Sequence, residues 1–144
     1  MKDQSSFQPS NEPCASHLTP DDTWCMWIDS WGMRCSWATV VDERIVSRDG
    51  TDTTADEVLD WAVDLIEDET GDRFALNHNV MLATMHRIVR ERDSVQLSDE
   101  IIDQISEVLE ATSHAAATDE LCQLDCVGFD AIVQFATLGQ VVYG

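Results

Sequence analysis

Two long stretches of this chain, residues 51–72 and 93–144, contain no lysine or arginine, although together they carry 19 aspartate and glutamate side chains. Because burying an unpaired carboxylate is very costly, we expect most of these acidic side chains to lie on solvated faces. Each element should therefore have an acidic solvent face and an apolar core face. Residues 73–92, which lie between the two stretches, carry one acidic and four basic side chains.

The 144-residue chain has a formal net charge of −20 at pH 7, yet its apolar fraction of 44% is ordinary for a globular protein. Disorder throughout the chain is not expected, because disorder requires low hydrophobicity as well as high charge. A field of this size repels nucleic acid and anionic membranes, and it attracts basic protein surfaces. We therefore expect a protein partner with a basic surface, and no direct contact with nucleic acid or a membrane.

The chain has no run of 18 apolar residues, and its first residues lack the apolar stretch of a signal peptide. Its five cysteines are an odd number, which fits a compartment where thiols stay reduced. These features predict a soluble cytoplasmic protein, acting in the host cytoplasm if a phage encodes it.

The N-terminal part divides into two segments of different composition. Residues 1–20 are polar and hold all three prolines, which predicts a flexible tail followed by one compact domain over residues 21–144. Residues 23–48 are rich in Trp, Val, Ile and Thr, and turn-forming residues at 29–32 separate two β-prone runs. This pattern predicts a Trp-rich β-hairpin, with a further turn at Asp42–Glu43 and a possible third strand from Arg44.

From residue 54 onward the apolar residues recur with the period of a helix. Four helices are predicted, over residues 54–70 with Thr54 and Glu57 as a capping box, 77–92, 98–110 with Ser98 as N-cap, and about 119–138 with Gly139 as terminator. The fourth is apolar over most of its circumference, which suits the centre of a bundle or an oligomer interface. Residues 141–143 could form a short strand beside the hairpin.

The predicted fold class is therefore α+β. A Trp-rich N-terminal β-hairpin or small antiparallel sheet, in residues 21–50, packs on a bundle of about four helices in residues 51–144.

An aspartate stands at every fourth position from residue 52 to residue 72. Asp56, Asp60, Asp64 and Asp68 would lie along one side of the predicted first helix, at intervals of about 6 Å. Such a row resembles the charges of a phosphate backbone and could engage the basic groove of a nucleic-acid-binding protein. The alternative is a solvated face in an acid-rich proteome, such as that of a salt-loving organism.

Two further groups of residues complete the predicted binding surface. The third helix carries Asp99, Asp103, Glu107 and Glu110 on its polar side. Trp24, Trp27, Trp31 and Trp37 cluster within 14 residues, and tryptophan is enriched at binding hot spots. We expect Trp31, at the predicted hairpin tip, to be an exposed anchor and the other three to belong to the core.

The remaining candidates are basic residues, cysteines and histidines. Arg87, Arg90 and Arg92, with His86 alongside, are expected to pair with acidic faces of neighbouring helices. Cys14, His17, Cys25 and Cys35 have the side chains of metal ligands, but they lack the two tight pairs typical of zinc sites. Cys122 and Cys126, one turn apart on the predicted fourth helix, are interpreted as small buried thiols. No metal or cofactor is predicted, although a metal on the first four residues stays open.

No catalytic motif is present: the chain has no phosphate-binding glycine loop, no HExxH, no GxSxG and no EF-hand loop. In size and charge it resembles the small acidic inhibitors of mobile elements, such as anti-restriction and anti-CRISPR DNA mimics. The leading hypothesis is a non-enzymatic inhibitor that occupies the basic groove of a nucleic-acid-binding protein. The alternative is a structural or regulatory protein that docks or forms a homodimer through its Trp-rich hairpin and apolar C-terminal helix, with its acidity serving solubility.

Overall fold

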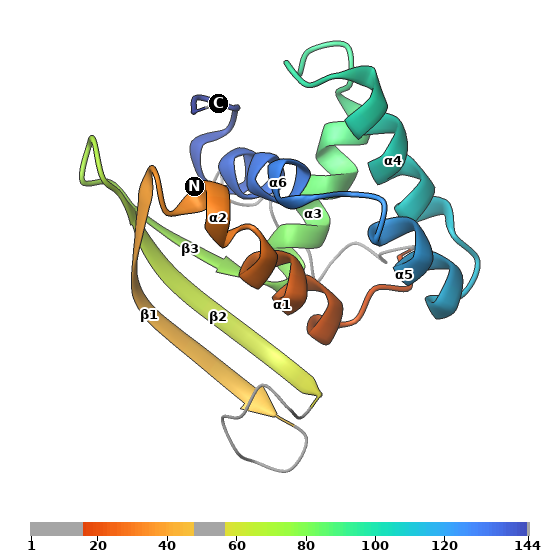
Figure 1. The fold of residues 1–144 in the computed structure, drawn as a ribbon, viewed down its shortest axis with the longest axis horizontal. Coiled ribbons are helices and arrows are strands. Elements are labelled where there is room, and N and C mark those ends of the chain that lie inside the picture. Colours follow the sequence, from red (N-terminus) through yellow and green to blue (C-terminus); the bar gives the residue numbers. More distant parts are fainter. Residues whose placement is uncertain (1–15, 48–56, 144) are drawn as a thin grey trace, which may run out of the picture.

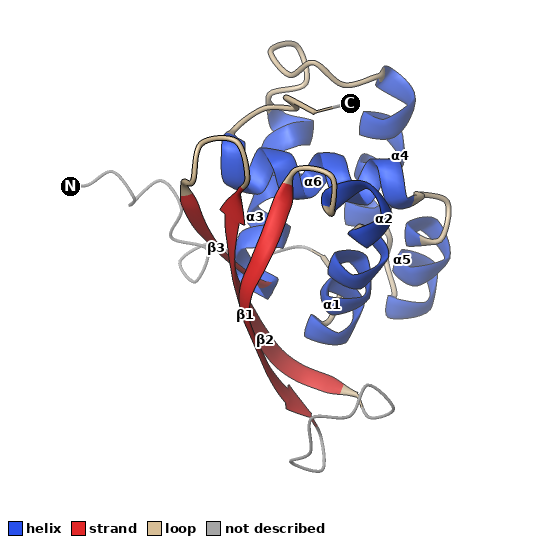
Figure 2. Cartoon of the chain, turned by 60° about the vertical axis from the view of Figure 1, so that its left-hand side comes forward, coloured by secondary structure: helices blue, strands red, loops and turns tan. Residues whose placement is uncertain are grey.

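The computed structural model describes residues 16–47 and 57–143, which form an α+β fold (Figure 1). Its elements in chain order are α1 (Pro20–Asp29), α2 (Trp31–Arg34), β1 (Ala38–Ser47), β2 (Val58–Glu67), β3 (Arg73–Asn77), α3 (His78–Arg90), α4 (Asp99–Glu110), α5 (His114–Leu121) and α6 (Cys126–Leu138). The three strands form an antiparallel sheet in the order β1-β2-β3. The helices lie together on one side of this sheet (Figure 2).

The Trp-rich segment begins with a helix, so the predicted β-hairpin is wrong. Thr19 is the N-cap of α1: its hydroxyl accepts a hydrogen bond from the Asp22 N–H at 3.3 Å, and the Asp22 carboxylate accepts one from the Thr19 N–H at 2.8 Å. Pro20 occupies the first helical position, where its missing N–H leaves no bond unmade. The sequence from Thr19 to Asp22, interpreted above as a turn, is thus a helix start. The preceding Leu18 is buried in the core.

The segment predicted as the first helix is strand β2, and this is the largest correction to the sequence-based fold. The predicted N-cap Thr54 lies outside the described residues. On β2 the odd-numbered side chains Trp61, Val63 and Leu65 face the helices and are at most 2% exposed. Apolar burial against the helical layer therefore favours the strand over the helix.

Strand β1 is a single strand of ten residues. It pairs with β2 over its whole length, with a register shift between Val40 and Asp42. The turn predicted at Asp42–Glu43 is therefore absent, and an irregularity of the β-bulge kind stands at Val41 instead.

The helical half follows the prediction more closely. Asn77 caps α3 by accepting a hydrogen bond from the Val80 N–H at 2.8 Å, and Ser98 caps α4 by accepting one from the Ile101 N–H at 3.3 Å. The apolar faces predicted for both helices point into the core.

The predicted fourth helix is two helices, α5 and α6. Ser113 caps α5, whereas Asp125 caps α6 by accepting hydrogen bonds from the N–H groups of Val127 and Gly128. Cys122 consequently follows the end of α5 and Cys126 begins α6, and both are exposed rather than buried. Gly139 ends α6 with a φ of +80°, as predicted.

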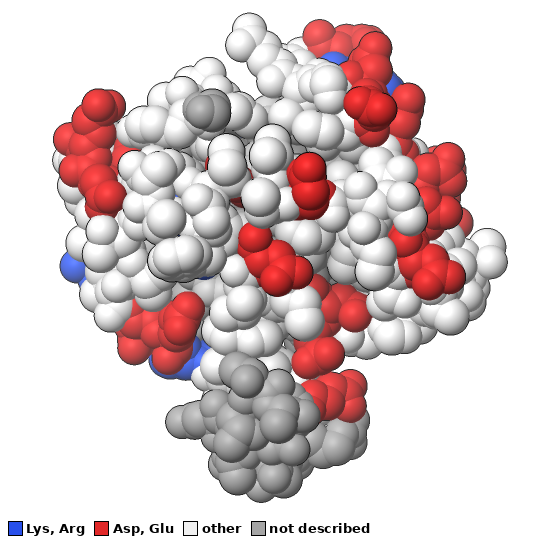
Figure 3. Space-filling view, viewed as in Figure 1, with Lys and Arg blue, Asp and Glu red and all other residues white. Residues whose placement is uncertain are grey.

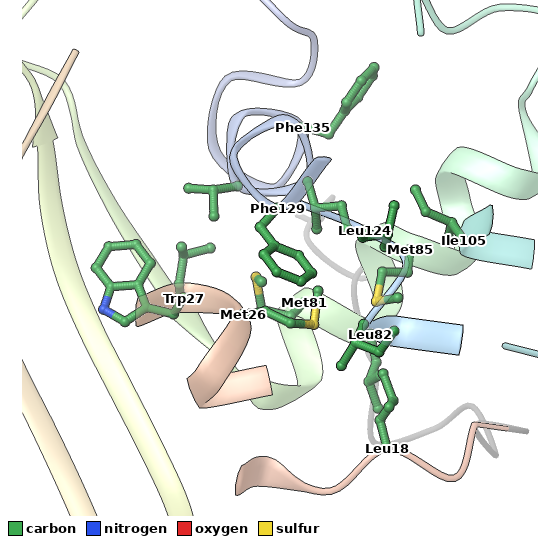
Figure 4. Close-up of a cluster of buried hydrophobic side chains, with 14 of the residues drawn as sticks. Leu18, Met26, Trp27, Met81, Leu82, Met85, Ile105, Leu124, Phe129 and Phe135 are labelled. Carbon is green, nitrogen blue, oxygen red and sulfur yellow. The ribbon is translucent and has the colours of Figure 1, made fainter. Parts of the chain in front are cut away.

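Helix α6 lies at the centre of the helical layer, where eight of its 13 residues are buried. It packs against α1, α2 and α3. Figure 4 shows Phe129 pointing toward Met26 and Met81. The apolar surface of α6 is thus used inside the chain. No single described helix is long and apolar enough to cross a membrane; α5 and α6 meet that test only as a pair bent by 102°.

Tryptophans join the sheet to the helices. The Trp27 and Trp61 rings stack with their centroids 6.4 Å apart, and the Trp27 indole N–H donates to the Glu43 carboxylate at 2.9 Å. The guanidinium carbon of Arg34 lies 3.6 Å from the Trp27 ring centroid. Trp27 therefore contacts a second aromatic ring, a carboxylate and a cation at the same time.

Arg34 is one of the few cations of the chain, and it is only 3% exposed. Its side chain donates to the Ser30 hydroxyl at 2.9 Å and to the Trp27 carbonyl at 3.1 Å. Burial lowers the pKa of Arg34, and the nearby carboxylates of Glu43 and Asp130 oppose this effect. These contacts attach α2 to the end of α1.

The C-terminal residues 141–143 do not form the predicted strand; the buried side chain of Gln134 holds them instead. The Gln134 amide donates to the Tyr143 carbonyl at 2.8 Å, and its oxygen accepts from the N–H groups of Val142 and Tyr143 at 2.8 and 2.9 Å. The Tyr143 ring stacks on Trp37 with a centroid distance of 5.6 Å. We call this set of contacts the tail clasp.

Asp130 lies beneath the tail clasp and is only 3% exposed. Its carboxylate accepts from the Trp37 indole at 2.9 Å and from the Gln134 amide at 2.7 Å. Burial raises the pKa of Asp130, and these two hydrogen bonds together with the charge of Arg34 oppose the rise. The hydrogen bond from the Tyr143 hydroxyl to Glu67 raises the pKa of Tyr143.

Candidate acidic interface

The structure does not contain the predicted helical row of aspartates. Asp56 lies outside the described residues, Asp60 and Asp64 are on the outer face of β2, and Asp68 is in the turn that follows β2. On a strand, Asp60 and Asp64 are about 13 Å apart, roughly twice the spacing expected on a helix. Arg44 also contacts Asp64 at 3.2 Å, so charges of both signs lie on this face of the sheet.

The acidic residues predicted on the third helix are brought together as expected. Asp99, Asp103, Glu107 and Glu110 are all exposed on α4. They lie opposite a buried face that contains Ile102. Their spacing of three or four residues places them along one side of the helix.

Helix α5 extends this surface with acidic residues that sequence reasoning missed. The Gln104 side-chain amide on α4 donates to the Glu120 carbonyl at 2.8 Å and to the Glu120 carboxylate at 2.9 Å, which fixes α5 against α4. We define the acidic α4–α5 face as Asp99, Glu100, Asp103, Glu107, Glu110, Asp119 and Glu120. Figure 3 shows acidic residues gathered over these two helices at the right-hand side of the molecule.

Arginine 92 partly neutralises one end of the acidic α4–α5 face. Its guanidinium lies 2.8 Å from the Asp103 carboxylate and 3.7 Å from that of Asp99, as predicted for the basic helix. The hydrogen bond that Arg92 donates to Asp103 raises the pKa of Arg92. Arg87 and Arg90 instead contact Glu91. The described ion pairs of the face thus lie at its Asp99 end, away from Glu107 and Glu110.

Trp31 is the most exposed tryptophan of the described residues, with 63% of its surface accessible, and Ile28 beside it is 43% exposed. Its exposure was predicted, but it begins the short helix α2 and is not at a hairpin tip. Trp24, Trp27 and Trp37 are buried in the core, also as predicted.

No protein-family model matches this chain, and no curated protein or solved structure matches it significantly. The residues and their geometry are therefore the basis for proposing a function.

Within residues 16–47 and 57–143, no group of three or more histidine, cysteine, aspartate or glutamate side chains is arranged to hold a metal ion. Cys14, one of the four residues considered for zinc, lies outside this range. Cys25 and Cys35 are exposed free thiols on α1 and at the end of α2.

One hydrogen-bonded pair resembles the nucleophile and base of an enzyme. The Thr23 hydroxyl lies 2.9 Å from Nδ1 of His78, and burial lowers the pKa of His78. Thr23 is completely buried, however, and its hydroxyl also accepts from the Trp61 indole at 2.9 Å. A substrate could not reach this oxygen, so the pair serves to join α1, β2 and α3.

The excess of carboxylates predicts that salt stabilises the fold. Raising NaCl from about 0.1 M to about 1 M shortens the Debye length from about 10 Å to about 3 Å and weakens repulsion among exposed carboxylates. We expect the unfolding midpoint to rise by roughly 5 °C, which corresponds to about 1–2 kcal/mol for a domain of this size. Calorimetry at the two salt concentrations measures this rise.

A variant with Asp103→Asn, Glu107→Gln and Glu110→Gln, called here the face-neutralised variant, provides the control for this measurement. It should show a smaller rise with salt because it has three fewer charges on the crowded face. A midpoint that stays constant or falls with salt would contradict the expectation.

Proposed function

We propose that this protein is a small acidic inhibitor that docks its acidic α4–α5 face into the basic groove of a nucleic-acid-binding protein, in place of nucleic acid. The observation that carries the proposal is the concentration of seven exposed or half-exposed carboxylates on two packed helices, with the Arg92 ion pairs only at one end. A rigid helical surface with this charge is complementary to side chains that bind phosphate groups.

Electrostatics would act mainly on the rate of encounter. Opposite net charges raise association rates well above those of neutral pairs, whereas release is governed by close contacts. Trp31 and Ile28 are exposed apolar side chains that could supply such contacts. The action follows the class of anti-restriction and anti-CRISPR DNA mimics, which the chain resembles in size and charge. No catalytic step is involved.

Asp60, Asp64 and Asp68 are not part of the proposed interface. Asp60 and Asp64 belong to the outer face of the sheet, and the helices lie on its other side (Figure 2). A groove that receives α4 and α5 would leave them in solvent. Asp60, together with the exposed Asp68 and Asp72 in the segment after β2, provides a control for any effect of charge that is not specific to the face.

The test compares two variants from which the same number of charges has been removed. The wild type, the face-neutralised variant and a control variant (Asp60→Asn, Asp68→Asn and Asp72→Asn) serve as bait at low salt, and bound proteins are eluted with increasing salt. We expect the face-neutralised variant to bind its partner at least tenfold more weakly, a loss of about 1.4 kcal/mol or more. The control variant should stay close to the wild type.

A second measurement links binding to function. Wild-type protein added to the purified partner should displace a bound labelled duplex, and the displacement should weaken steeply with salt. Equal binding by both variants, or a partner that holds its nucleic acid undisturbed, would overturn the proposal.

A further inference from the structure

A pocket of about 330 Å³ opens between α1 on one side and α5 and the start of α6 on the other. Its lining residues are Asp22, Cys25, Met26, Asp29, Thr118, Leu121, Cys122, Leu124 and Phe129. The volume is at the lower end of the range for ligand pockets and suits one large side chain better than an extended ligand.

The floor of the pocket is apolar and well packed. Met26, Leu121, Leu124 and Phe129 are each at most 8% exposed, so their positions are fixed by the core behind them. Figure 4 shows the Phe129 ring beside Met26 at this point. An apolar group that enters the pocket would replace water on these side chains, at roughly 25 cal/mol per Å² of apolar surface buried.

The wall formed by α1 is acidic. Asp22 and Asp29 are seven residues apart, about 10 Å along the helix axis, and none of the lining residues is basic. The Asp22 carboxylate is already hydrogen-bonded to His114 Nε2 at 2.9 Å and to the N–H of the cap residue Thr19 at 2.8 Å. Asp29, in contrast, is exposed. Partial burial raises the pKa of the Cys25 thiol, and the charges of Asp21, Asp29 and Asp22 raise it further. Negative potential therefore extends into the pocket.

The pocket adjoins the acidic α4–α5 face. Thr118 and Leu121 of α5 and the following Cys122 line it, while the intervening Asp119 and Glu120 belong to the face. At its other end, Asp29 lies in the chain between the exposed Ile28 and Trp31. A protein seated on the face would thus have the pocket within reach.

We propose that this pocket receives an apolar side chain flanked by lysine or arginine on the basic partner. The identity of the partner as a basic protein rests on the proposed function. The choice of occupant rests on charge complementarity: the apolar group fills the floor, and the adjacent cations meet Asp29 and the carboxylate-rich surroundings. An acidic residue beside the apolar group would face the same carboxylates and be repelled.

Three capped tripeptides test the pocket without the partner: acetyl-Lys-Phe-Lys-amide, acetyl-Glu-Phe-Glu-amide and acetyl-Lys-Ala-Lys-amide. Each is titrated into the full chain, with the methyl signals of Met26, Leu121 and Leu124 followed by NMR. The Lys-Phe-Lys peptide should shift these signals in a saturable way. The Lys-Ala-Lys peptide should bind at least tenfold more weakly, and the Glu-Phe-Glu peptide should leave the signals in place.

Two variants locate the binding. Cys122→Trp places a large ring at the exposed edge of the pocket and should abolish the shifts, whereas Leu59→Trp, at an exposed position on β2, should not. Asp29→Asn should weaken Lys-Phe-Lys binding by about twofold to fivefold, the size expected for an exposed charge contact.

The outcome is separable from that of the proposed function. The face-neutralised variant should keep its pocket binding. Peptide shifts that appear as expected, together with equal partner binding by the face-neutralised and control variants, would sink the proposed function alone. Equal shifts from all three peptides, or undiminished binding to the Cys122→Trp variant, would overturn the pocket assignment.

Discussion

Replacing Trp27 with alanine is expected to lower the free energy of unfolding by about 4 kcal/mol, the range found when a buried aromatic side chain is truncated. Trp27 is completely buried, stacks on Trp61 and supports the guanidinium of Arg34. Its removal leaves a cavity between the sheet and the helices. It also removes the cation–π contact of the buried Arg34 guanidinium. Because domains of this size are stable by only about 5–15 kcal/mol, the loss is a large fraction of the total.

Trp27→Phe is the matched control. Phenylalanine keeps an aromatic ring near Arg34 but loses the hydrogen bond to the exposed Glu43, so a loss of only about 1–2 kcal/mol is expected. Urea denaturation followed by far-UV circular dichroism measures both variants. Equal losses for alanine and phenylalanine would mean that the ring and its cation contact contribute little.

Replacing Gln134 with leucine is expected to release the tail clasp and to lower the free energy of unfolding by about 2–3 kcal/mol. Leucine fills a similar volume but cannot pair with the backbone groups of Val142 and Tyr143, which would then turn to water. The buried carboxylate of Asp130 would lose a donor as well. Hydrogen exchange at the Val142 and Tyr143 amides should become at least tenfold faster.

Gln140→Leu is the control for this variant, since Gln140 is an exposed residue in the same segment. Its exchange rates and stability should stay close to those of the wild type. Protected tail amides in the Gln134→Leu variant would show that stacking of Tyr143 on Trp37, and not the glutamine, holds the segment in place.

The error at β2 shows where the sequence is ambiguous. Residues four apart share a side of a helix and also share a face of a strand, because four is close to the helical period and is a multiple of the strand period. The aspartates at positions 60 and 64 therefore fit both structures. The alternation of apolar residues at Trp61, Val63 and Leu65 is typical of a strand. The capping pattern at residues 54–57, in contrast, favours a helix over the same segment.

Polar caps explain the other differences. Thr19 and Asp22 start α1 in a segment whose tryptophans and isoleucine favour strands, and the contacts of α1 with the sheet outweigh that weak preference. Asp125 starts α6 four residues after α5 ends. Thr19 and Asp125 are residue types that favour the N-cap position, so the sequence contained a signal for both helix starts. The tail clasp was not predictable, because it depends on a buried glutamine that meets residues eight and nine positions later.

The candidate site was predictable only where an element was assigned correctly. Ser98 and the apolar period of α4 placed Asp103 and Glu107 on an exposed face. The contribution of α5 to the site depends on the packing of Gln104 against Glu120, which no local pattern reveals. The pocket likewise brings α1 together with residues about 90 positions later, so only the tertiary structure shows it.

The burial of Arg34 has a consequence for how the protein responds to its medium. Dissolved ions weaken interactions between solvent-exposed charges far more than interactions of buried charges. The contacts of Arg34 with Trp27 and Ser30 should therefore persist at high salt. The acidic α4–α5 face, in contrast, should attract cations over a shorter distance. Ionic strength thus weakens the electrostatic field of the acidic α4–α5 face and leaves the junction of α1 and α2 intact, so the protein should regain that field when the salt is diluted.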